Sequence, residues 1–184
     1  MMKLIYRLLL LLLFITTFSV LNAQEEDRGY IVKVGDKIPD SIIVKLTDGS
    51  VVNVNNLKGK IVLLQFTASW CSVCIKEMPH LENEVWKVYK DKGLVFVGID
   101  RDEPIERVKE FKSKLKITYP LALDPGANIF AKFAHKEAGV TRNILIDKDG
   151  TIIYLTRLYD EHEFAGLKKK IAEVFCTVEH VQKI

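Results

Sequence analysis

The spacing of apolar residues along the chain predicts strands and helices in alternation. Apolar residues without alternation fill 61–66 and 94–99, which is typical of strands covered on both faces. Each of these strands is followed by a segment with apolar residues at helical spacing, 71–90 and 104–115 respectively. Such alternation favours an α/β domain in which helices pack against parallel strands.

Further elements surround this predicted core. They are a hairpin near the beginning, then a short strand, a helix, a second hairpin and a closing helix. Their ranges, in this order, are 44–46 with 51–54, 120–123, 127–134, 144–147 with 151–155, and 163–175. Asp48-Gly49 is a favoured turn pair for the first hairpin. Pro79 lies inside the predicted helix 71–90 and lacks a backbone N–H, so we expect a kink there.

The beginning of the chain has the pattern of an export signal. Lys3 and Arg7 precede an apolar run over 8–15, and Ala23 is a small residue at a suitable cleavage point. Leu21 stands where a small residue is usual, so an uncleaved N-terminal membrane anchor is the alternative. Both interpretations predict an exported domain, in a bacterial periplasm or on the outer face of the cytoplasmic membrane.

The chain is expected to divide into three parts. Residues 1–23 form the signal peptide or anchor, 24–33 form an acidic and polar flexible spacer, and 34–184 form one domain. The formal net charge of +3 gives no indication of nucleic-acid binding. Three cysteines are too few for a disulfide framework in an exported domain, which favours a chemical use for a close pair.

Cys71 and Cys74 form such a pair at the start of the helix predicted after the strand 61–66. One helical turn brings their sulfurs within bonding range. Unpaired N–H groups and the helix dipole stabilise a thiolate at a helix N-terminus. We therefore predict Cys71 as the attacking sulfur and Cys74, one turn further in, as the more buried resolving sulfur.

Metal binding is the main alternative for two cysteines at this spacing. A structural zinc site needs about four ligands, and the chain offers no second close pair. The remaining candidate ligands are Cys176, His80, His135, His162 and His180. We therefore predict redox chemistry without a metal or other cofactor. Cys176 shares an apolar stripe with Ile171 and Phe175 on the closing helix, so we expect it to be buried.

Two longer segments carry a family resemblance. Residues 57–79 read LKGKIVLLQFTASWCSVCIKEMP and residues 143–150 read NILIDKDG. Together they resemble exported thioredoxin-like thiol-disulfide oxidoreductases of the TlpA and ResA type, over roughly 34–176. The resemblance implies a thioredoxin fold, with a central mixed sheet flanked by helices, an N-terminal β-hairpin and a central βα insertion.

The same resemblance implies a function and partners. It implies disulfide exchange with exported proteins that carry a disulfide or a dithiol. Relatives of this type act mostly as reductants, and some serve cytochrome c maturation. A membrane thiol-disulfide transfer protein is the partner expected to recharge the cysteines.

Roles for individual residues also follow from the resemblance. Cys71 resembles the family's nucleophile and Cys74 its resolving cysteine, with Trp70 beside them. Glu77 matches the family's active-site glutamate, and a carboxylate near the buried thiol can take its proton. The alternative is that Glu77 is a surface residue of the helix. Gln65 stands where thioredoxins carry a buried acid, and its amide cannot shuttle a proton, which favours Glu77.

One position departs from the family pattern. The family has a cis-proline just before the strand matched by 144–147, and Thr141 stands there in this sequence. A cis peptide bond without proline costs about 2.5 to 4 kcal/mol, so we expect a trans bond. Thr141 and Arg142 can instead place a hydroxyl and a guanidinium beside the sulfurs and stabilise a thiolate. An Arg142 side chain in solvent is the alternative.

Two other functions stay open at this point. Peroxiredoxins share the thioredoxin fold, lack the proline and place an arginine near a peroxide-reactive cysteine. Their cysteine normally follows a loop with proline and threonine, whereas 66–71 contains no proline. A copper carrier of thioredoxin fold uses a wider cysteine spacing and a distant histidine, for which His135 is the candidate.

Overall fold

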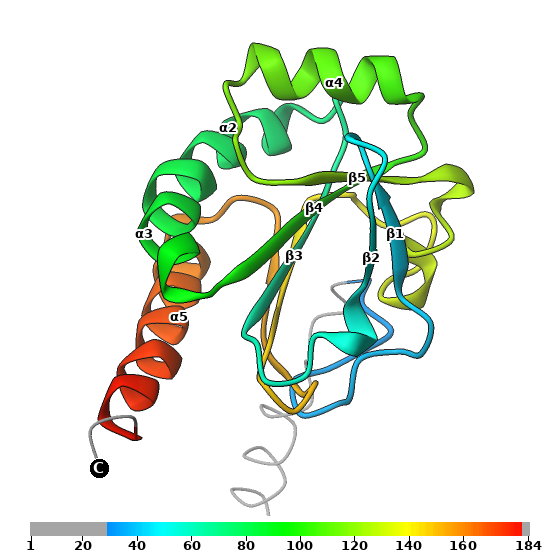
Figure 1. Cartoon of the computed structure of the whole chain (residues 1–184). Helices are drawn as coiled ribbons and strands as arrows, with labels where there is room; N and C mark the ends of the chain where they lie inside the picture. Colours follow the sequence, from blue (N-terminus) through cyan, green and yellow to red (C-terminus); the bar gives the residue numbers. More distant parts are fainter. Residues whose placement is uncertain (1–28, 182–184) are drawn as a thin grey trace, which may run out of the picture.

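The structure is a computed structural model that describes residues 29–181 (Figure 1). The predicted signal or anchor (1–23) and most of the predicted spacer lie outside this range. In the part of the chain that is described, no helix has both the length and the apolar character needed to cross a membrane.

Seven strands of the described range form one mixed β-sheet. In chain order they are β1 (Ile43–Leu46), β2 (Val51–Asn53), β3 (Val62–Thr67), β4 (Val95–Arg101), β5 (Leu121–Asp124), β6 (Arg142–Ile146) and β7 (Ile152–Arg157). Across the sheet the order is β2-β1-β5-β4-β3-β6-β7. The pairs β3–β4 and β4–β5 are parallel, and the other neighbours are antiparallel. In Figure 1, β3 and β4 cross the middle of the sheet, and β1 and β2 lie at one edge.

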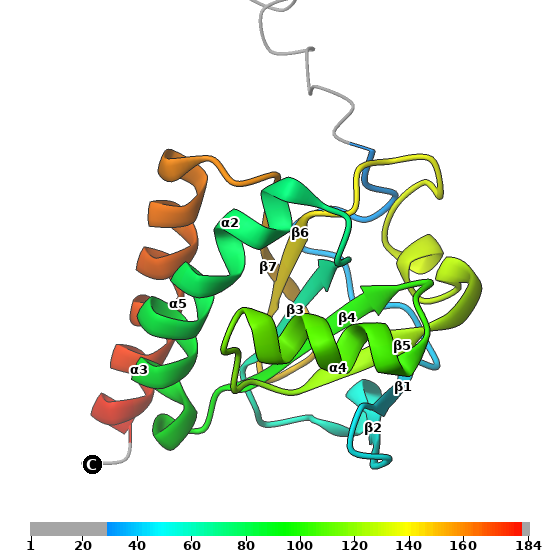
Figure 2. The same cartoon turned by 90° about the horizontal axis from the view of Figure 1, so that it is seen from above.

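Helices cover one face of this sheet. They are α2 (Ser72–His80), the π-helical segment η2 (Leu81–Trp86), α3 (Lys87–Tyr89), α4 (Ile105–Lys114) and α5 (Glu161–Val181). Figure 2 shows α2, α3 and α5 side by side, and the rings of Tyr89 and Phe175 join α3 to α5 with centroids 5.1 Å apart. The helix α4 lies beside α2, because side chains of both line a shared cleft.

Short 3-10 turns occupy the opposite face. They are η4 (Pro125–Ala127) and η5 (Phe130–Lys132). Two other 3-10 turns, η1 (Val54–Asn56) and η3 (Lys90–Lys92), do not belong to this group. Phe66 of β3 packs against Phe130 and Phe133, with ring centroids 5.2 and 5.6 Å apart. The two faces of β3 therefore have different partners, helices on one side and the η4–η5 segment on the other.

The predicted fold class is confirmed. The β1–β2 hairpin, the buried strands β3 and β4 and the helix after each of them lie close to the predicted ranges. The inserted unit is α4 with β5, and β1 pairs with β5, so the insertion connects the N-terminal hairpin to the rest of the sheet.

The helix predicted over 127–134 is wrong. Gly126 and Ala127 take positive φ angles of 70° and 53°, which interrupts helical geometry at its start. The Asp124 carboxylate accepts the backbone N–H groups of Ile129 and Phe130, both at 2.8 Å, and so caps the start of the second turn, which begins at Phe130. The segment consequently folds as two separate 3-10 turns.

Pro79 lies inside α2, in the helix that was predicted to continue to about residue 90. The helix passes through Pro79 and changes to π-helical geometry at Leu81, in η2. The expectation that Cys176 is buried is wrong, because its side chain is exposed. Ile171 and Phe175 are four residues apart on the buried face of α5, and the next residue is turned by about 100° around the helix axis.

The predicted spacer includes residues that are attached to the domain. The Tyr30 hydroxyl donates to the Thr156 carbonyl oxygen at 2.5 Å, and the Ile31 N–H donates to the Phe133 carbonyl oxygen at 2.9 Å. Contacts of the domain therefore begin before residue 34.

Candidate active site

Cys71 and Cys74 form a disulfide at the N-terminus of α2. Their Cα atoms are 5.3 Å apart. Cys71 is the N-cap residue, and its Sγ accepts the backbone N–H of Cys74 at 3.1 Å. Cys71 is 8% exposed and Cys74 is 0% exposed. The predicted proximity and the predicted difference in burial are therefore both observed.

The loop from β3 to α2 is fixed by a carboxylate. Glu103, which follows β4, accepts the Ser69 N–H at 2.5 Å and the Ser69 hydroxyl at 2.6 Å. The Cys71 N–H donates to the Ala68 carbonyl oxygen at 3.1 Å. Trp70, between the fixed Ser69 and Cys71, is 65% exposed. The loop thus holds Cys71 in place and presents an indole ring to solvent beside it.

Thr141 contacts both sulfurs. Its Oγ1 lies 3.1 Å from Cys71 Sγ and 3.1 Å from Cys74 Sγ, and the residue is 2% exposed. Over residues 29–181 there is no cis peptide bond, so the bond before Thr141 is trans, as expected. The hydroxyl therefore occupies the side of the disulfide where the family pattern has a proline.

Glu77 is buried beneath the pair. It is 1% exposed, which excludes the alternative of a surface residue. Its carboxylate accepts Asn143 Nδ2 at 2.6 Å and Gln65 Nε2 at 3.3 Å. Burial raises the pKa of Glu77 from 4.5 to about 7, the two amide hydrogen bonds oppose this rise, and the charge of Glu163 adds to it. The carboxyl group is therefore poised to gain or lose a proton near neutral pH.

Glu77 belongs to a buried polar network. Gln65 and Asn143 are direct partners in the β3–β6 register. Tyr119 donates its hydroxyl to Gln65 Oε1 at 2.8 Å, and Asn143 Nδ2 also donates to Thr156 Oγ1 at 2.8 Å. The roles of Asn143, Tyr119 and Thr156 were not predicted. The polar Asn143, directly before the apolar run 144–146, was the available signal.

Arg142 lies on the other face of the sheet. Successive strand residues point to opposite faces, and its neighbours Thr141 and Asn143 both contact groups of α2. The Arg142 guanidinium carbon lies 4.3 Å from the centroid of the Tyr30 ring, and the residue is 1% exposed. Neither alternative for Arg142, beside the sulfurs or in solvent, is what the structure shows.

A second buried carboxyl group lies at the end of β4. Asp100 is 0% exposed and is the register partner of Thr67. Burial and the neighbouring charge of Glu103 raise the pKa of Asp100 to about 8. Asp100 therefore adds a mostly protonated acid beneath the loop that carries Cys71.

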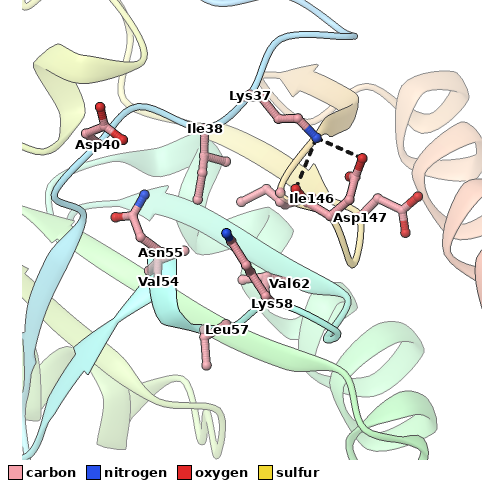
Figure 3. Close-up of a pocket in the computed structure, with 12 residues that line it drawn as sticks. Lys37, Ile38, Asp40, Val54, Asn55, Leu57, Lys58, Val62, Ile146 and Asp147 are labelled. Carbon is pink, nitrogen blue, oxygen red and sulfur yellow. Dashed lines mark hydrogen bonds and ion pairs between the residues drawn. The ribbon is translucent and has the colours of Figure 1, made fainter.

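A cavity of about 330 Å³ lies at the end of β3 that is remote from the cysteines (Figure 3). Val62, the first residue of β3, and Ile146, the last residue of β6, are part of its wall. Lys37 bridges to Asp149 at 2.8 Å on its rim. The strand β3 has six residues, so its length of about 17 Å lies between this cavity and the loop that leads to the cysteines. It contributes nothing to the disulfide site.

Metal ligands do not gather in the described range. No group of three or more histidine, cysteine, aspartate or glutamate side chains there has the arrangement of a metal site. His135, the residue named for a copper carrier, is exposed.

A disulfide at the N-terminus of the helix that follows a central strand of a mixed sheet defines a thioredoxin-fold thiol-disulfide oxidoreductase. The Redoxin family profile matches residues 33–171. The chain belongs to the Redoxin family and is an oxidoreductase of the TlpA and ResA type.

Individual relatives agree with this assignment. The thiol-disulfide oxidoreductase ResA of Bacillus thuringiensis (strain Al Hakam) is 31% identical over 175 residues, which cover 92% of this chain and 96% of the relative. A proposed protein disulfide isomerase from Bacteroides thetaiotaomicron is 52% identical, with a TM-score of 0.78 over 84% of this chain and 97% of the other. A proposed thiol:disulfide interchange protein DsbE from Chlorobium tepidum is 25% identical, with a TM-score of 0.69 over 78% of this chain and 99% of the other.

Proposed function

We propose that this oxidoreductase acts on exported proteins, mainly as a reductant, with Cys71 as nucleophile, Cys74 as resolving thiol and Glu77 as proton acceptor. The observation that carries the proposal is the graded burial of the site. The sulfur of Cys71 lies nearer the surface, that of Cys74 is enclosed, and a carboxyl group with a pKa near 7 lies one helical turn from Cys74.

The first step forms a mixed disulfide. The Cys71 thiolate attacks one sulfur of the substrate disulfide, a Cys71–substrate bond forms, and the substrate bond breaks. The departing substrate sulfur leaves as a thiolate and takes a proton from solvent. The N–H of Cys74, already 3.1 Å from Cys71 Sγ, stabilises the attacking thiolate.

The second step releases the substrate. Glu77 takes the proton of the Cys74 thiol, and the resulting thiolate attacks Cys71 Sγ. The Cys71–Cys74 disulfide forms, the mixed disulfide breaks, and the second substrate sulfur leaves reduced. Thr141, directly before β6, and Asn143 in β6 support this geometry, because Thr141 contacts Cys74 while Asn143, on the same face, holds Glu77. In total two electrons pass from the dithiol to the substrate.

Protein substrates are favoured by the surface around Cys71. Trp70 is 65% exposed and Ile75 is 40% exposed, on either side of the pair. Large apolar side chains in solvent next to a reactive group are typical of a site that contacts another protein. We propose that substrate segments cover these two residues during exchange.

The proposed location is outside the cytoplasm. The charged and apolar N-terminal segment supports export, either with cleavage after Ala23 or with retention as an anchor. A membrane thiol-disulfide transfer protein is the proposed source of electrons. Resemblance to the ResA type favours a substrate in cytochrome c maturation.

Isomerase activity is the second candidate. It is favoured by the 52% identity to the proposed protein disulfide isomerase from Bacteroides thetaiotaomicron. Isomerases and oxidants need a less stable disulfide than reductants do, so the reduction potential separates the two candidates.

An equilibrium redox titration of the purified protein tests the proposal. Thiol alkylation and mass spectrometry report the oxidation state of Cys71 and Cys74 without any known substrate. A two-electron transition at about −250 mV or lower is expected for the reductant. A transition between about −180 and −120 mV would replace it with the isomerase or an oxidant. Oxidation of Cys71 by peroxide without closure of the pair would support the peroxidase instead.

A further inference from the structure

The Thr141 hydroxyl lies beside the disulfide, with its oxygen 3.1 Å from each of the two sulfurs. A proline, which the family pattern has at this position, carries no side-chain hydrogen-bond donor. The contact is therefore a feature of this sequence, and its chemistry differs from that of the family pattern.

We propose that Thr141 is a redox-tuning residue, whose hydroxyl donates its hydrogen bond to the Cys71 thiolate and thereby stabilises the reduced pair against the disulfide. This inference rests on the proposed thiol-disulfide exchange and deepens it. It gives the exchange a built-in bias toward a higher, more oxidising reduction potential than the same site would have without the hydroxyl.

The bias follows from what each redox state offers the hydroxyl. A disulfide sulfur is a neutral and weak acceptor, whereas a thiolate is charged, and hydrogen bonds to charged groups are about twice as strong as neutral ones. The hydrogen bond that the Thr141 hydroxyl donates is therefore stronger in the reduced state than in the disulfide. Because Thr141 is 2% exposed, little water competes for the bond.

The hydroxyl can bridge both cysteines in the reduced enzyme. A threonine oxygen donates one hydrogen bond and accepts others. It can accept the S–H of Cys74 while it donates to the Cys71 thiolate. This order leaves Cys71 as the charged sulfur, which is the state that the proposed first step needs. The backbone supports the position, because the Leu158 N–H donates to the Thr141 carbonyl oxygen at 3.1 Å.

Three acids lie in the elements around Cys71. Glu77 in α2 carries the pKa raised to about 7, Asp100 in β4 is mostly protonated at neutral pH, and Glu103 bonds to Ser69 in the loop before the pair. A change at Thr141 alone leaves all three in place. The difference between wild type and variant therefore reports the hydroxyl.

Thr141→Val tests the proposal, because valine keeps the branched shape and removes the hydroxyl. The thiolate of Cys71 is followed by its ultraviolet absorbance as a function of pH in the reduced protein, and the potential by equilibration with glutathione. We expect the pKa of Cys71 to rise by about one unit. The equilibrium constant for the disulfide should shift about tenfold toward oxidation of the pair, which lowers the potential by about 30 mV.

Two further variants make the test specific. Thr141→Ser keeps a hydroxyl, so its Cys71 pKa and its reduction potential are expected to stay close to the wild-type values. Thr67→Val is the matched control, since Thr67 is a buried threonine of β3 whose hydroxyl contacts Met78 Sδ at 3.2 Å instead of the cysteines, and it should leave both values unchanged. Thr141→Ala removes the same hydroxyl and replaces Thr141→Val if the valine variant does not fold.

Unchanged values in Thr141→Val, or a serine variant that behaves like the valine variant, would overturn the proposal. Neither readout needs a substrate. Failure of the reductant function appears separately, as a wild-type potential above the expected range, so the two failures are distinguishable.

Discussion

Glu77 is a single residue that lowers the stability of the fold and at the same time suits the role of proton acceptor. It is an acid at 1% exposure that accepts hydrogen bonds from two amides, and burial raises its pKa to about 7. A charged carboxylate in such a place costs free energy of folding. A pKa near neutrality is also what a proton acceptor for the Cys74 thiol requires.

Glu77→Gln should therefore stabilise the oxidised protein at alkaline pH. The unfolded chain releases the Glu77 proton near pH 4.5 and the folded chain near pH 7, so the wild type loses stability as pH rises through this window. The variant lacks that loss. Its advantage should be small at about pH 4.5 and reach about 3 kcal/mol above about pH 7, measured by urea unfolding.

The matched control is Glu84→Gln in η2. Glu84 is partly exposed, and its hydrogen bonds to Lys168 and His80 hold its pKa below the usual value. This variant should show no alkaline gain. If Glu77→Gln and wild type had parallel stability profiles across the window, the raised pKa would be contradicted.

Glu77→Gln should also slow release of substrate from the mixed disulfide by about 100-fold, because the variant cannot take the proton of the Cys74 thiol. Quenched-flow alkylation measures this rate.

At the scale of elements, β4 makes room for the polar network. Gly98 lies opposite Gln65 in the β3–β4 register. A Cβ atom built on Gly98 clashes with the Leu121 side chain and comes within 3.1 Å of the Tyr119 ring. Tyr119 in turn holds Gln65, which holds Glu77. The glycine thus allows three neighbouring strands and α2 to share one buried cluster.

Gly98→Ala should destabilise the protein by about 1 to 3 kcal/mol, because the added methyl group overpacks this cluster. The midpoint of urea unfolding measures the loss. Gly139→Ala is the matched control, since a Cβ at Gly139 meets nothing within 4 Å, and its stability should stay within about 0.5 kcal/mol of wild type. Equal effects of the two substitutions would contradict the packing argument.

At the scale of the whole molecule, local patterns predicted the scaffold and long-range contacts completed the site. The Asp48-Gly49 turn and the apolar run 61–66 act through neighbouring residues, so the hairpin and the central strand could be read from the sequence. The 127–134 segment could not, because its turns depend on positive φ angles and on the carboxylate of Asp124. Cys176 was predicted to be buried and is exposed, because it follows the buried Phe175 by one residue on α5 and so points in another direction.

The site shows the same division. The cysteines at one-turn spacing identified the reactive pair, and their order of burial followed from helix geometry. The partners of Glu77 come from distant parts of the chain, since Gln65 and Asn143 meet only when β3 and β6 pair. The face on which Arg142 lies depends on the register of β6, which a pattern of apolar residues does not define.

Trapping of the mixed disulfide tests whether Cys71 is the sulfur that attacks the substrate. Reduced Cys74→Ser protein is mixed with insulin as a disulfide-containing probe, and covalent adducts are located by mass spectrometry. We expect a stable adduct through Cys71, because the resolving sulfur is absent. Reduced Cys71→Ser protein, whose remaining active-site sulfur is buried, should form little adduct through Cys74, and adducts through the exposed Cys176 are counted separately in both variants. Adducts through Cys74 in the second variant at the level of the first, or none in either, would contradict the assignment of Cys71 as nucleophile.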